Sequence, residues 1–472
     1  MKDDAAPTDP STHPGRRVLV RAGIPALAVM AASFVHTEIV HRSWDRLNAI
    51  FCVWSPTRSN VNDALPAIEA ARTLAETHHG AIYDMSQTDR AAFLYPPIAA
   101  AIYLPHVAEG EGALWSLVAF NRLVFMVIAL LLTAALIGPK RRWPTLPEAA
   151  FVASAMVLFL PMVRSLELNQ ASLYVALLVG AAWVALDRGA LVVAGVCLGL
   201  VAGVKPHLFA VAPLLVFHAR RTTIAAAVTA AALGAASIAY AGWENHVTYA
   251  THVLPEAARG YAFFPNQSFG ALLHRLTFAG AIDEFQLMPR DPGVMRATLA
   301  VAALLQGAAF VLVARARKRL DLKREVLALA WLVTTMSAPI AWGHHYAAAL
   351  FPLAWLLGRA RDGFETRAGR LAAVAVGCAL LGSYFVVGDL RGPVTRLLAS
   401  YGLFGAVLAA GAFAKTLAGA SLQRQEDDAI PRSAPGDEPI ALQDEVQGAG
   451  AEDLGGDGEP ALLAGARQAP GP

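Results

Sequence analysis

Polar residues stand at the boundaries of long apolar runs in this sequence, where a buried polar group needs a reason. Lys205 follows the apolar run 198–204 and directly precedes Pro206 and His207. Polar groups at membrane depth are costly and often functional. An amine in this place can bind an anion, or it can extend along the apolar surface to lipid headgroups. The residue alone leaves both interpretations open.

Four further polar sets lie in the segments between the apolar runs: Asp63, Asn169-Gln170, Asn266-Gln267-Ser268 and His344-His345. A carboxylate can act as a general base, and amides can hydrogen-bond the hydroxyls of a sugar. Asn266-Gln267-Ser268 also matches an N-glycosylation acceptor. Adjacent histidines on a helix point about 100° apart, so a metal shared by the pair is disfavoured. The sequence therefore predicts acid–base and anion-binding chemistry without a metal.

The elements that must position these residues are membrane helices. Of the 472 residues, 56% are hydrophobic and 16% charged, against about 25% charged in soluble proteins. Runs such as 113–137 and 223–241 reach the roughly 20 residues that a membrane crossing requires. The net charge of +2 gives no indication of nucleic-acid binding. The widely separated Cys52, Cys197 and Cys378 form no disulfide framework or metal-ligand spacing.

The apolar pattern predicts an all-α polytopic protein with about ten to twelve spans. The candidate spans are 18–35, 113–137, 149–163, 171–186, 190–204, 208–217, 223–241, 297–314, 326–342, 346–357, 371–387 and 397–414. If they are counted in this order, the clusters of lysine and arginine fall on one side. These clusters are 16–17, 140–142, 220–221, 315–324 and 359–370. Positive charge marks the cytoplasmic side, so the polar sets listed above belong to the outer side.

Two long segments, 36–112 and 242–296, then lie outside, and the site is expected on this periplasmic or extracellular face. Residues 64–75 have the mixed composition of a helix lying at the membrane surface. The run that follows Tyr95-Pro96-Pro97 is too short to cross, so a re-entrant or interfacial segment is expected.

The ends of the chain differ in composition from this membrane domain, which we place at 16–420. Residues 1–15 are polar and contain proline, and residues 421–472 are acidic and rich in glycine, proline and alanine. Such sequences cannot bury enough apolar surface to fold. Both segments are predicted to be disordered. The protein is expected in the inner membrane, with its C-terminal tail in the cytoplasm.

No Walker loop, Gly-rich nucleotide fingerprint or acidic metal-binding cluster of a cytoplasmic loop occurs in the sequence. Energy or an activated donor must then arrive in lipid-soluble form or as an ion gradient, and no cofactor is predicted.

Several short motifs, in their order and spacing, resemble those of one enzyme family. They are Asp63 with Glu69-Ala70-Ala71-Arg72, Gly80-Ala81-Ile82-Tyr83-Asp84, Phe93-Leu94-Tyr95-Pro96-Pro97, Leu168-Asn169-Gln170, Gly203-Val204-Lys205-Pro206, Asn266-Gln267-Ser268 with Arg275, and Ser337-Ala338-Pro339 with Trp342-Gly343-His344-His345. The chain resembles glycosyltransferase family 87, polyprenol-phosphate-sugar-dependent membrane enzymes with the GT-C fold, among them mycobacterial α-mannosyltransferases. Its Ala64-Leu65 replaces the aromatic residue that usually follows the acid in the family, a difference that concerns the acceptor side.

The resemblance implies a GT-C-like bundle that transfers a hexose, with mannose favoured, from polyprenyl phosphate to a lipid-linked or glycan acceptor with inversion. Asp63 would be the general base. Lys205, His344 and His345 would bind the donor phosphate, and no metal is implied. The residues implied to bind sugar or acceptor are Tyr95, Asn169, Gln170, Asn266 and Gln267.

Two other functions fit parts of the pattern. A transporter or flippase of lipid-linked sugars would use Lys205 and Asp63 as ion or headgroup sites, with internal repeats and broken helices at the bilayer midplane. The sequence shows no internal repeat, and its polar sets gather toward one face. A glycan ligase or polymerase with an oligosaccharide donor is also compatible with the two long outer segments.

Overall fold

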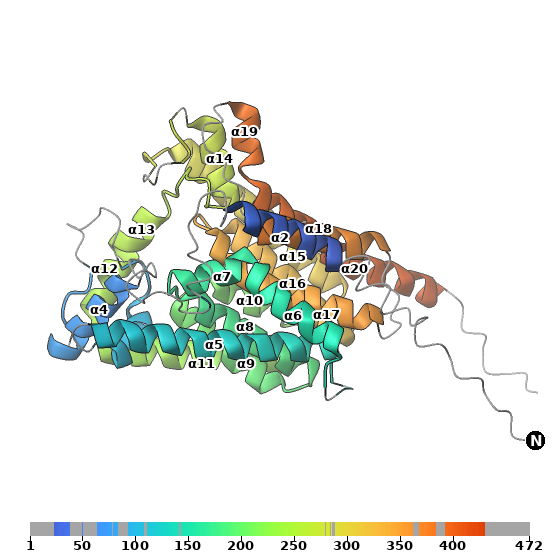
Figure 1. Cartoon of the computed structure of the whole chain (residues 1–472), viewed down its shortest axis with the longest axis horizontal. Coiled ribbons are helices and arrows are strands. Elements are labelled where there is room, and N and C mark those ends of the chain that lie inside the picture. Colours follow the sequence, from blue (N-terminus) through green and yellow to red (C-terminus); the bar gives the residue numbers. More distant parts are fainter. Residues whose placement is uncertain are drawn as a thin grey trace, which may run out of the picture. The chain divides into compact units, whose positions relative to one another are not determined.

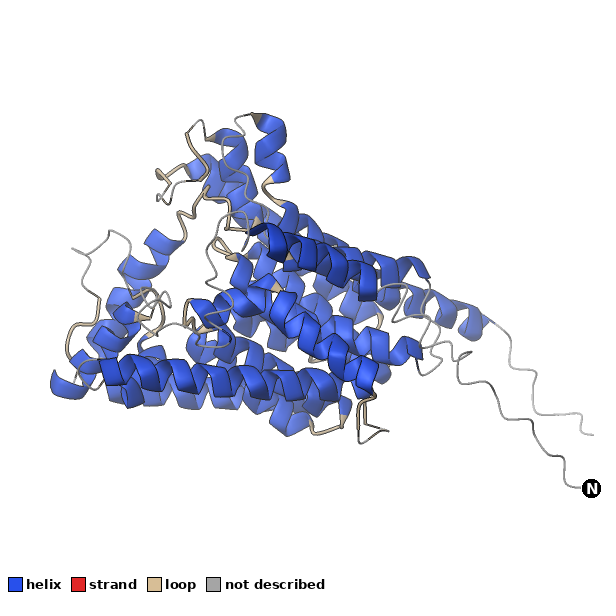
Figure 2. Ribbon diagram, viewed as in Figure 1, coloured by secondary structure: helices blue, strands red, loops and turns tan. Residues whose placement is uncertain are grey.

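The computed structural model describes residues 23–37, 50, 64–77, 79–83, 93–107, 111–139, 141, 143–278, 280–283, 285, 288–361, 368–383 and 392–429. Within these ranges the regular elements are helices joined by loops, and the β-structure is limited to one isolated bridge between Asn266 and Trp342 (Figure 2). Residues 1–425 form one compact unit. The second unit, 426–472, contributes only the last residues of one helix to the described part, and residues 1–22 and 430–472 lie outside it.

Four described helices are long and apolar enough to cross a membrane: α5 (Glu111–Ile137), α11 (Arg220–Ala241), α15 (Pro292–Arg315) and α20 (Tyr401–Ala429). Shorter apolar helices accompany them: α2 (Ile24–Val35), α8 (Ser172–Asp187), α9 (Leu191–Val204) and part of α18 (Ala368–Gly382). The remaining long elements are α16 (Lys323–Ser337) and α17 (Leu350–Arg361). The prediction of an all-α polytopic membrane protein is confirmed (Figure 1).

Proline changes two predicted spans. The segment expected to span the membrane over 149–163 consists of two helices, α6 (Leu146–Leu158) and α7 (Leu160–Glu167), which meet at a bend of 57°. Phe159 is extended there and Pro161 stands in the first turn of α7, where its missing N–H is tolerated. The span expected over 208–217 is instead made of two short helical pieces, η7 (Pro206–Ala210) and α10 (Val211–Leu214).

Helices α9 and α11 run in parallel and in close contact. A Cβ atom added to Gly195 would lie 2.3 Å from the Thr222 carbonyl oxygen, and one added to Gly199 would lie 2.7 Å from that of Ala226. Small residues allow such backbone contact between membrane helices. Because the two helices share a direction, residues 205–219 must return the chain to the start of α11. Lys205 and Ala241 therefore lie at the same end of the helices, which we call the site end.

The two long loops both dock at the site end. In the first, α4 (Leu65–Thr77) packs against the 3-10 helix η6 (Pro97–His106). Asn245, at the start of the second, donates from Nδ2 to the Gly80 carbonyl over 2.9 Å. The helix expected over 64–75 is thus present, and the apolar run after Tyr95 forms η6 rather than a span.

The second loop continues as α12 (Trp243–Thr248), the π-helix η8 (Tyr249–Val253), α13 (Leu254–Ala257) and α14 (Phe269–Thr277). Two short helices lie elsewhere in the chain: η9 (Leu320–Leu322) and α19 (Pro393–Leu398). One more 3-10 helix, η10 (Gly343–Ala349), precedes α17 and packs against α7 and α8. The contacts of η10 place the second half of the chain against the first at the site end.

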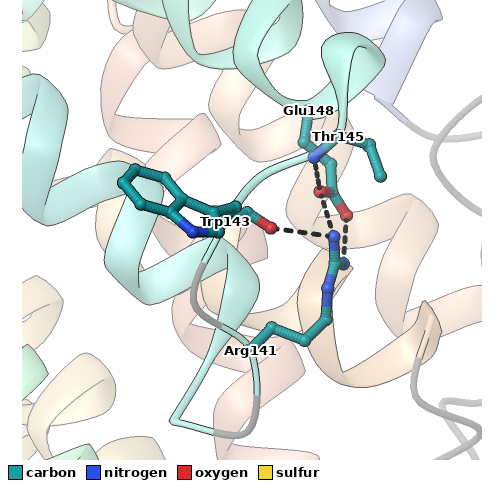
Figure 3. A network of polar contacts seen from close by, with 4 residues as sticks. All are labelled: Arg141, Trp143, Thr145 and Glu148. Carbon is teal, nitrogen blue, oxygen red and sulfur yellow. Dashed lines mark hydrogen bonds and ion pairs between the residues drawn. The ribbon is translucent and has the colours of Figure 1, made fainter.

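The opposite end of α5 is closed by a capped turn (Figure 3). Arg141 donates to both carboxylate oxygens of Glu148, over 2.9 and 3.1 Å, and to the Trp143 carbonyl over 3.1 Å. Glu148 also accepts from the Thr145 backbone N–H over 2.7 Å, which caps the start of α6. Trp143 is 80% exposed, as expected of a tryptophan at a membrane interface.

Candidate functional site

Lys205 is the residue around which the site end is organised. Helix α9 stops there because Lys205 takes an extended conformation, with φ −139° and ψ 91°, ahead of Pro206. The residue is 6% exposed, and its Nζ donates to Ser172 Oγ over 2.9 Å. Within the described ranges, no carboxylate lies within ion-pair distance of this amine. A buried ammonium without a counter-ion is unfavourable, so the position favours binding of an anion.

The turn between α7 and α8 carries Asn169, Gln170 and Ser172. Helix α7 ends in a Schellman-type turn, in which the Gln170 N–H donates to the Ser165 carbonyl over 2.9 Å. Asn169 holds the left-handed conformation of this turn at φ +50°, a conformation that asparagine tolerates better than most residues. The next residues start α8, so Ser172 reaches Lys205. The turn thus brings the predicted pair Asn169-Gln170 close to Lys205.

Tyr95 joins the same turn from the first loop. Its hydroxyl donates to Gln170 Oε1 over 2.6 Å, and its carbonyl accepts from the Tyr83 hydroxyl over 2.6 Å. Ile98, at the start of η6, lies beside Gly203, two residues before Lys205. The structure therefore brings Tyr95, predicted from the first loop, to the residues predicted from α7 and α9.

His344 and His345 lie on η10, which contacts α7 and α8. Ser165 Oγ, on the last turn of α7, donates to the His344 carbonyl over 3.3 Å, and the two imidazole rings are 4.8 Å apart and nearly perpendicular. Burial first, and then repulsion by the nearby Lys205 ammonium, lower the pKa of both histidines. Both imidazoles are therefore neutral at neutral pH. The Nε2 atom of His344 is buried and has no hydrogen-bond partner in the described part of the chain.

His207 indicates that this basic region is accessible. Its side chain is exposed, yet desolvation by the surrounding protein, reinforced by Lys205, lowers its pKa to about 3. Arg164, which also lowers the pKa of His344, is paired with Glu167 on α7. Lys205 therefore acts electrostatically on His207, His344 and His345, and Arg164 acts on His344.

Asn266 and Gln267 are at the site end, but their amides are occupied by backbone. Asn266 donates to the Tyr261 and Pro339 carbonyls over 3.2 and 3.3 Å and accepts from the Ala341 N–H over 2.8 Å. Gln267 donates to the Phe264 and Ala399 carbonyls and accepts from the Leu403 N–H over 3.2 Å. The bonds of Asn266 attach the second loop to the segment that leads into η10, and those of Gln267 attach it to the residues around the start of α20.

Arg275 supports this attachment from α14. Its buried guanidinium donates to the Asn266 carbonyl over 2.8 Å and to Ser400 Oγ over 2.8 Å. Burial lowers its pKa to about 9. The second loop therefore holds η10 in place through backbone contacts.

Asp63 lies outside the described residues. The described chain resumes at Ala64, which is fully buried, and the Ala64 carbonyl accepts the first bonds of α4. The described residues contain no group of three or more side chains arranged to hold a metal ion.

Several residues with contacts at the site end were not singled out from the sequence: Asn121, Ser165, Ser172 and Tyr174. Asn121 is fully buried on α5, donates to Asn169 Oδ1 over 2.9 Å and accepts from the Tyr174 hydroxyl over 2.6 Å. An asparagine inside an apolar span was a usable signal. The serines and the tyrosine have no such signal, because their roles depend on partners distant in the chain.

The sequence model of Glycosyltransferase family 87 matches residues 93–339, which include Tyr95, the turn at Asn169, Lys205 and Asn266-Gln267. Asp63 and the two histidines lie outside the matched range. No curated protein matches the chain. No solved structure matches it, so the GT-C architecture remains a prediction. Because the match covers more than half of the 472 residues, the chain belongs to glycosyltransferase family 87 and is a membrane glycosyltransferase.

Proposed function

We propose that the protein transfers a hexose, with mannose favoured, from a polyprenyl-phosphate-linked sugar to a lipid-linked or glycan acceptor. The observation that carries this proposal is the buried Lys205 amine, which lacks a carboxylate partner among the described residues and lies within a set of basic groups. Such a centre suits the phosphate of a donor that arrives through the lipid. A phosphodiester leaving group is already anionic, so it requires charge stabilisation rather than a general acid.

The reaction follows from this placement. Asp63, directly before the start of α4, would take the proton of the acceptor hydroxyl. The acceptor oxygen forms a bond to the anomeric carbon while the bond from that carbon to the phosphate oxygen breaks. Polyprenyl phosphate leaves with the electron pair, and Lys205 stabilises its charge. A single displacement inverts the anomeric configuration, so a β-linked donor gives an α-linked product.

The remaining predicted site residues receive distinct roles in the proposal. Neutral His344 and His345 contribute hydrogen bonds to the donor rather than charge, consistent with their lowered pKa values. Tyr95 and Gln170 orient each other beside the turn. Asn266 and Gln267 hold η10 in position instead of contacting sugar, because their donor hydrogens are used by backbone carbonyls.

We place the site end on the periplasmic side of the inner membrane and the C-terminus in the cytoplasm. The support comes from charge, because Lys140, Arg141 and Arg142 follow the end of α5 that is opposite to Asn121 and the turn. Lysine and arginine accumulate in cytoplasmic loops.

A transfer assay tests the function. The purified protein in liposomes would receive radiolabelled polyprenyl-phosphate hexoses and, separately, nucleotide sugars, together with a membrane lipid extract as acceptor. We expect transfer from the lipid-linked donor and a loss of about 10²- to 10⁴-fold in Asp63→Asn. The matched control is Glu69→Gln, since Glu69 lies on exposed α4 surface in an ion pair with Arg72. Transfer from nucleotide sugars alone, or full activity of Asp63→Asn, would overturn the proposal.

A further inference from the structure

A buried amide donor without a partner stands in the turn between α7 and α8. Asn169 is 2% exposed, and its Nδ2 atom has no hydrogen-bond partner among the residues that the structure describes, although its Oδ1 atom is bonded. Nearly all buried polar groups in native proteins are hydrogen-bonded, and an exception needs an explanation. The left-handed turn accounts for the backbone of this residue but not for its unpaired side-chain nitrogen.

A chain of hydrogen bonds fixes the direction of this amide. The Tyr174 hydroxyl donates to Asn121 Oδ1 over 2.6 Å, which leaves the Asn121 amide nitrogen to donate to Asn169 Oδ1 over 2.9 Å. Asn121 is fully buried and Tyr174 is 6% exposed, so water does not compete for these bonds. Because Oδ1 of Asn169 is occupied by Asn121, the NH₂ end of the amide is the end that is free to donate.

The free NH₂ group belongs to the turn that carries the Lys205 contact. Three residues after Asn169, Ser172 accepts from Lys205 Nζ over 2.9 Å at the first turn of α8. The amide nitrogen, the serine hydroxyl and the ammonium thus come from one turn and its direct neighbour. Donors of this kind suit an oxyanion, because hydrogen bonds to a charged acceptor are about twice as strong as neutral ones.

We propose that Asn169 Nδ2 donates to a phosphate oxygen of the polyprenyl-phosphate donor, and that Asn121 and Tyr174 are positioning residues that hold its amide in the donating orientation. This inference rests on the proposed function. It adds an amide ligand to the phosphate-binding residues already proposed, and it assigns positioning roles to Asn121 and Tyr174, which do not touch the reacting atoms.

Binding of polyprenyl phosphate and of the matching uncharged polyprenol to the full-length protein in lipid nanodiscs tests the inference. The decisive variant is Asn169→Gly, because glycine adopts φ +50° freely and deletes only the amide. Asn169→Asp keeps an oxygen that accepts from Asn121 and replaces the amide NH₂ group of Asn169 by a carboxylate oxygen. Tyr174→Phe removes one hydroxyl and keeps the ring contacts with Tyr103 and Phe120. Its control is Tyr240→Phe on α11, whose hydroxyl forms no hydrogen bond in the described structure.

We expect Asn169→Gly to weaken binding of polyprenyl phosphate by about tenfold or more while leaving polyprenol binding unchanged. Asn169→Asp should weaken binding of the phosphate further, and Tyr174→Phe should weaken it by about threefold with no effect of Tyr240→Phe. If the wild type binds polyprenyl phosphate and Asn169→Gly binds it equally well, the inference fails and the proposed function stands. A loss seen only with the sugar-bearing donor would also overturn the phosphate contact. If the wild type does not distinguish polyprenyl phosphate from polyprenol, both the proposed function and the inference fall.

Discussion

Replacing Lys205 with methionine should separate function from stability. The side chain is 6% exposed and its amine has Ser172 Oγ as a hydrogen-bond acceptor, with no carboxylate in contact within the described ranges. Methionine keeps a similar length and apolar character and removes the charge. An uncompensated buried charge is unfavourable, and replacing such a group with an apolar one is often neutral or stabilising by about 1–4 kcal/mol. We therefore expect the free energy of unfolding to stay the same or rise.

The loss of activity follows from the charge that the phosphate would meet. Two unit charges about 4 Å apart attract by about 4 kcal/mol at the effective dielectric constant of partly buried sites, which corresponds to roughly 10³-fold. A single charged hydrogen bond gives a lower limit of about 1.5 kcal/mol, or roughly tenfold. Lys205→Met should accordingly lower kcat/KM for the lipid-linked donor by a factor in this range, whereas Lys205→Arg should retain more of it.

In the absence of ligand, Lys205→Met should also lose part of the pH dependence of the free energy of unfolding. Burial lowers the pKa of Lys205, so between that lowered value and the ordinary value near 10.4 the unfolded chain binds more protons than the folded one. The free energy of unfolding contributed by this residue therefore rises with pH across that window. The rise should be absent in Lys205→Met. Thermal unfolding in detergent across alkaline pH, together with the transfer assay, measures both effects; a lower Tm with unchanged kcat/KM would refute the reasoning.

Three other substitutions test the remaining assignments. Asn266→Ala should lower the free energy of unfolding by about 1–3 kcal/mol, because it leaves the Ala341 N–H and two carbonyls without their partner; a variant with normal Tm and a raised donor KM would instead show a direct ligand contact. Thr145→Ala should cost about 1 kcal/mol at the start of α6 and leave kcat unchanged in the transfer assay, since the capped turn lies at the end away from the site. Gly180→Ala should reduce thermal stability by about 1–3 kcal/mol, as its Cβ would lie 2.1 Å from the Phe351 ring; an unchanged Tm would mean that this contact between α8 and Phe351 adjusts freely.

The apolar pattern predicted the four long membrane helices α5, α11, α15 and α20, because the hydrocarbon core imposes a length and a composition on any span, whereas ten to twelve spans were expected in all. The end of α9 at Lys205 could be predicted for a related reason, since a lysine and a proline follow an apolar run there. The break between α6 and α7 was missed, because a proline inside an apolar run is compatible with either a kinked span or a new helix start. The backbone of Phe159 is extended and separates the two helices.

The contacts inside the site could not be read from the sequence, since they join residues far apart in the chain. Asn121 and Asn169 are 48 positions apart, and Asn266 and Ala341 are 75 apart. The amides of Asn266 and Gln267 illustrate the consequence. Their residue type suggested sugar binding, and only the carbonyls around them show that their hydrogen bonds are used to attach the second loop.

A structure of the full-length protein in a lipid nanodisc with bound polyprenyl phosphate tests the central claim most directly. We expect a phosphate oxygen at hydrogen-bond distance, about 3 Å, from Lys205 Nζ, with the Asp63 carboxylate facing the position of the anomeric carbon. A phosphate bound at the other end of the helices, or Asp63 and Lys205 too far apart to contact one phosphosugar, would contradict it.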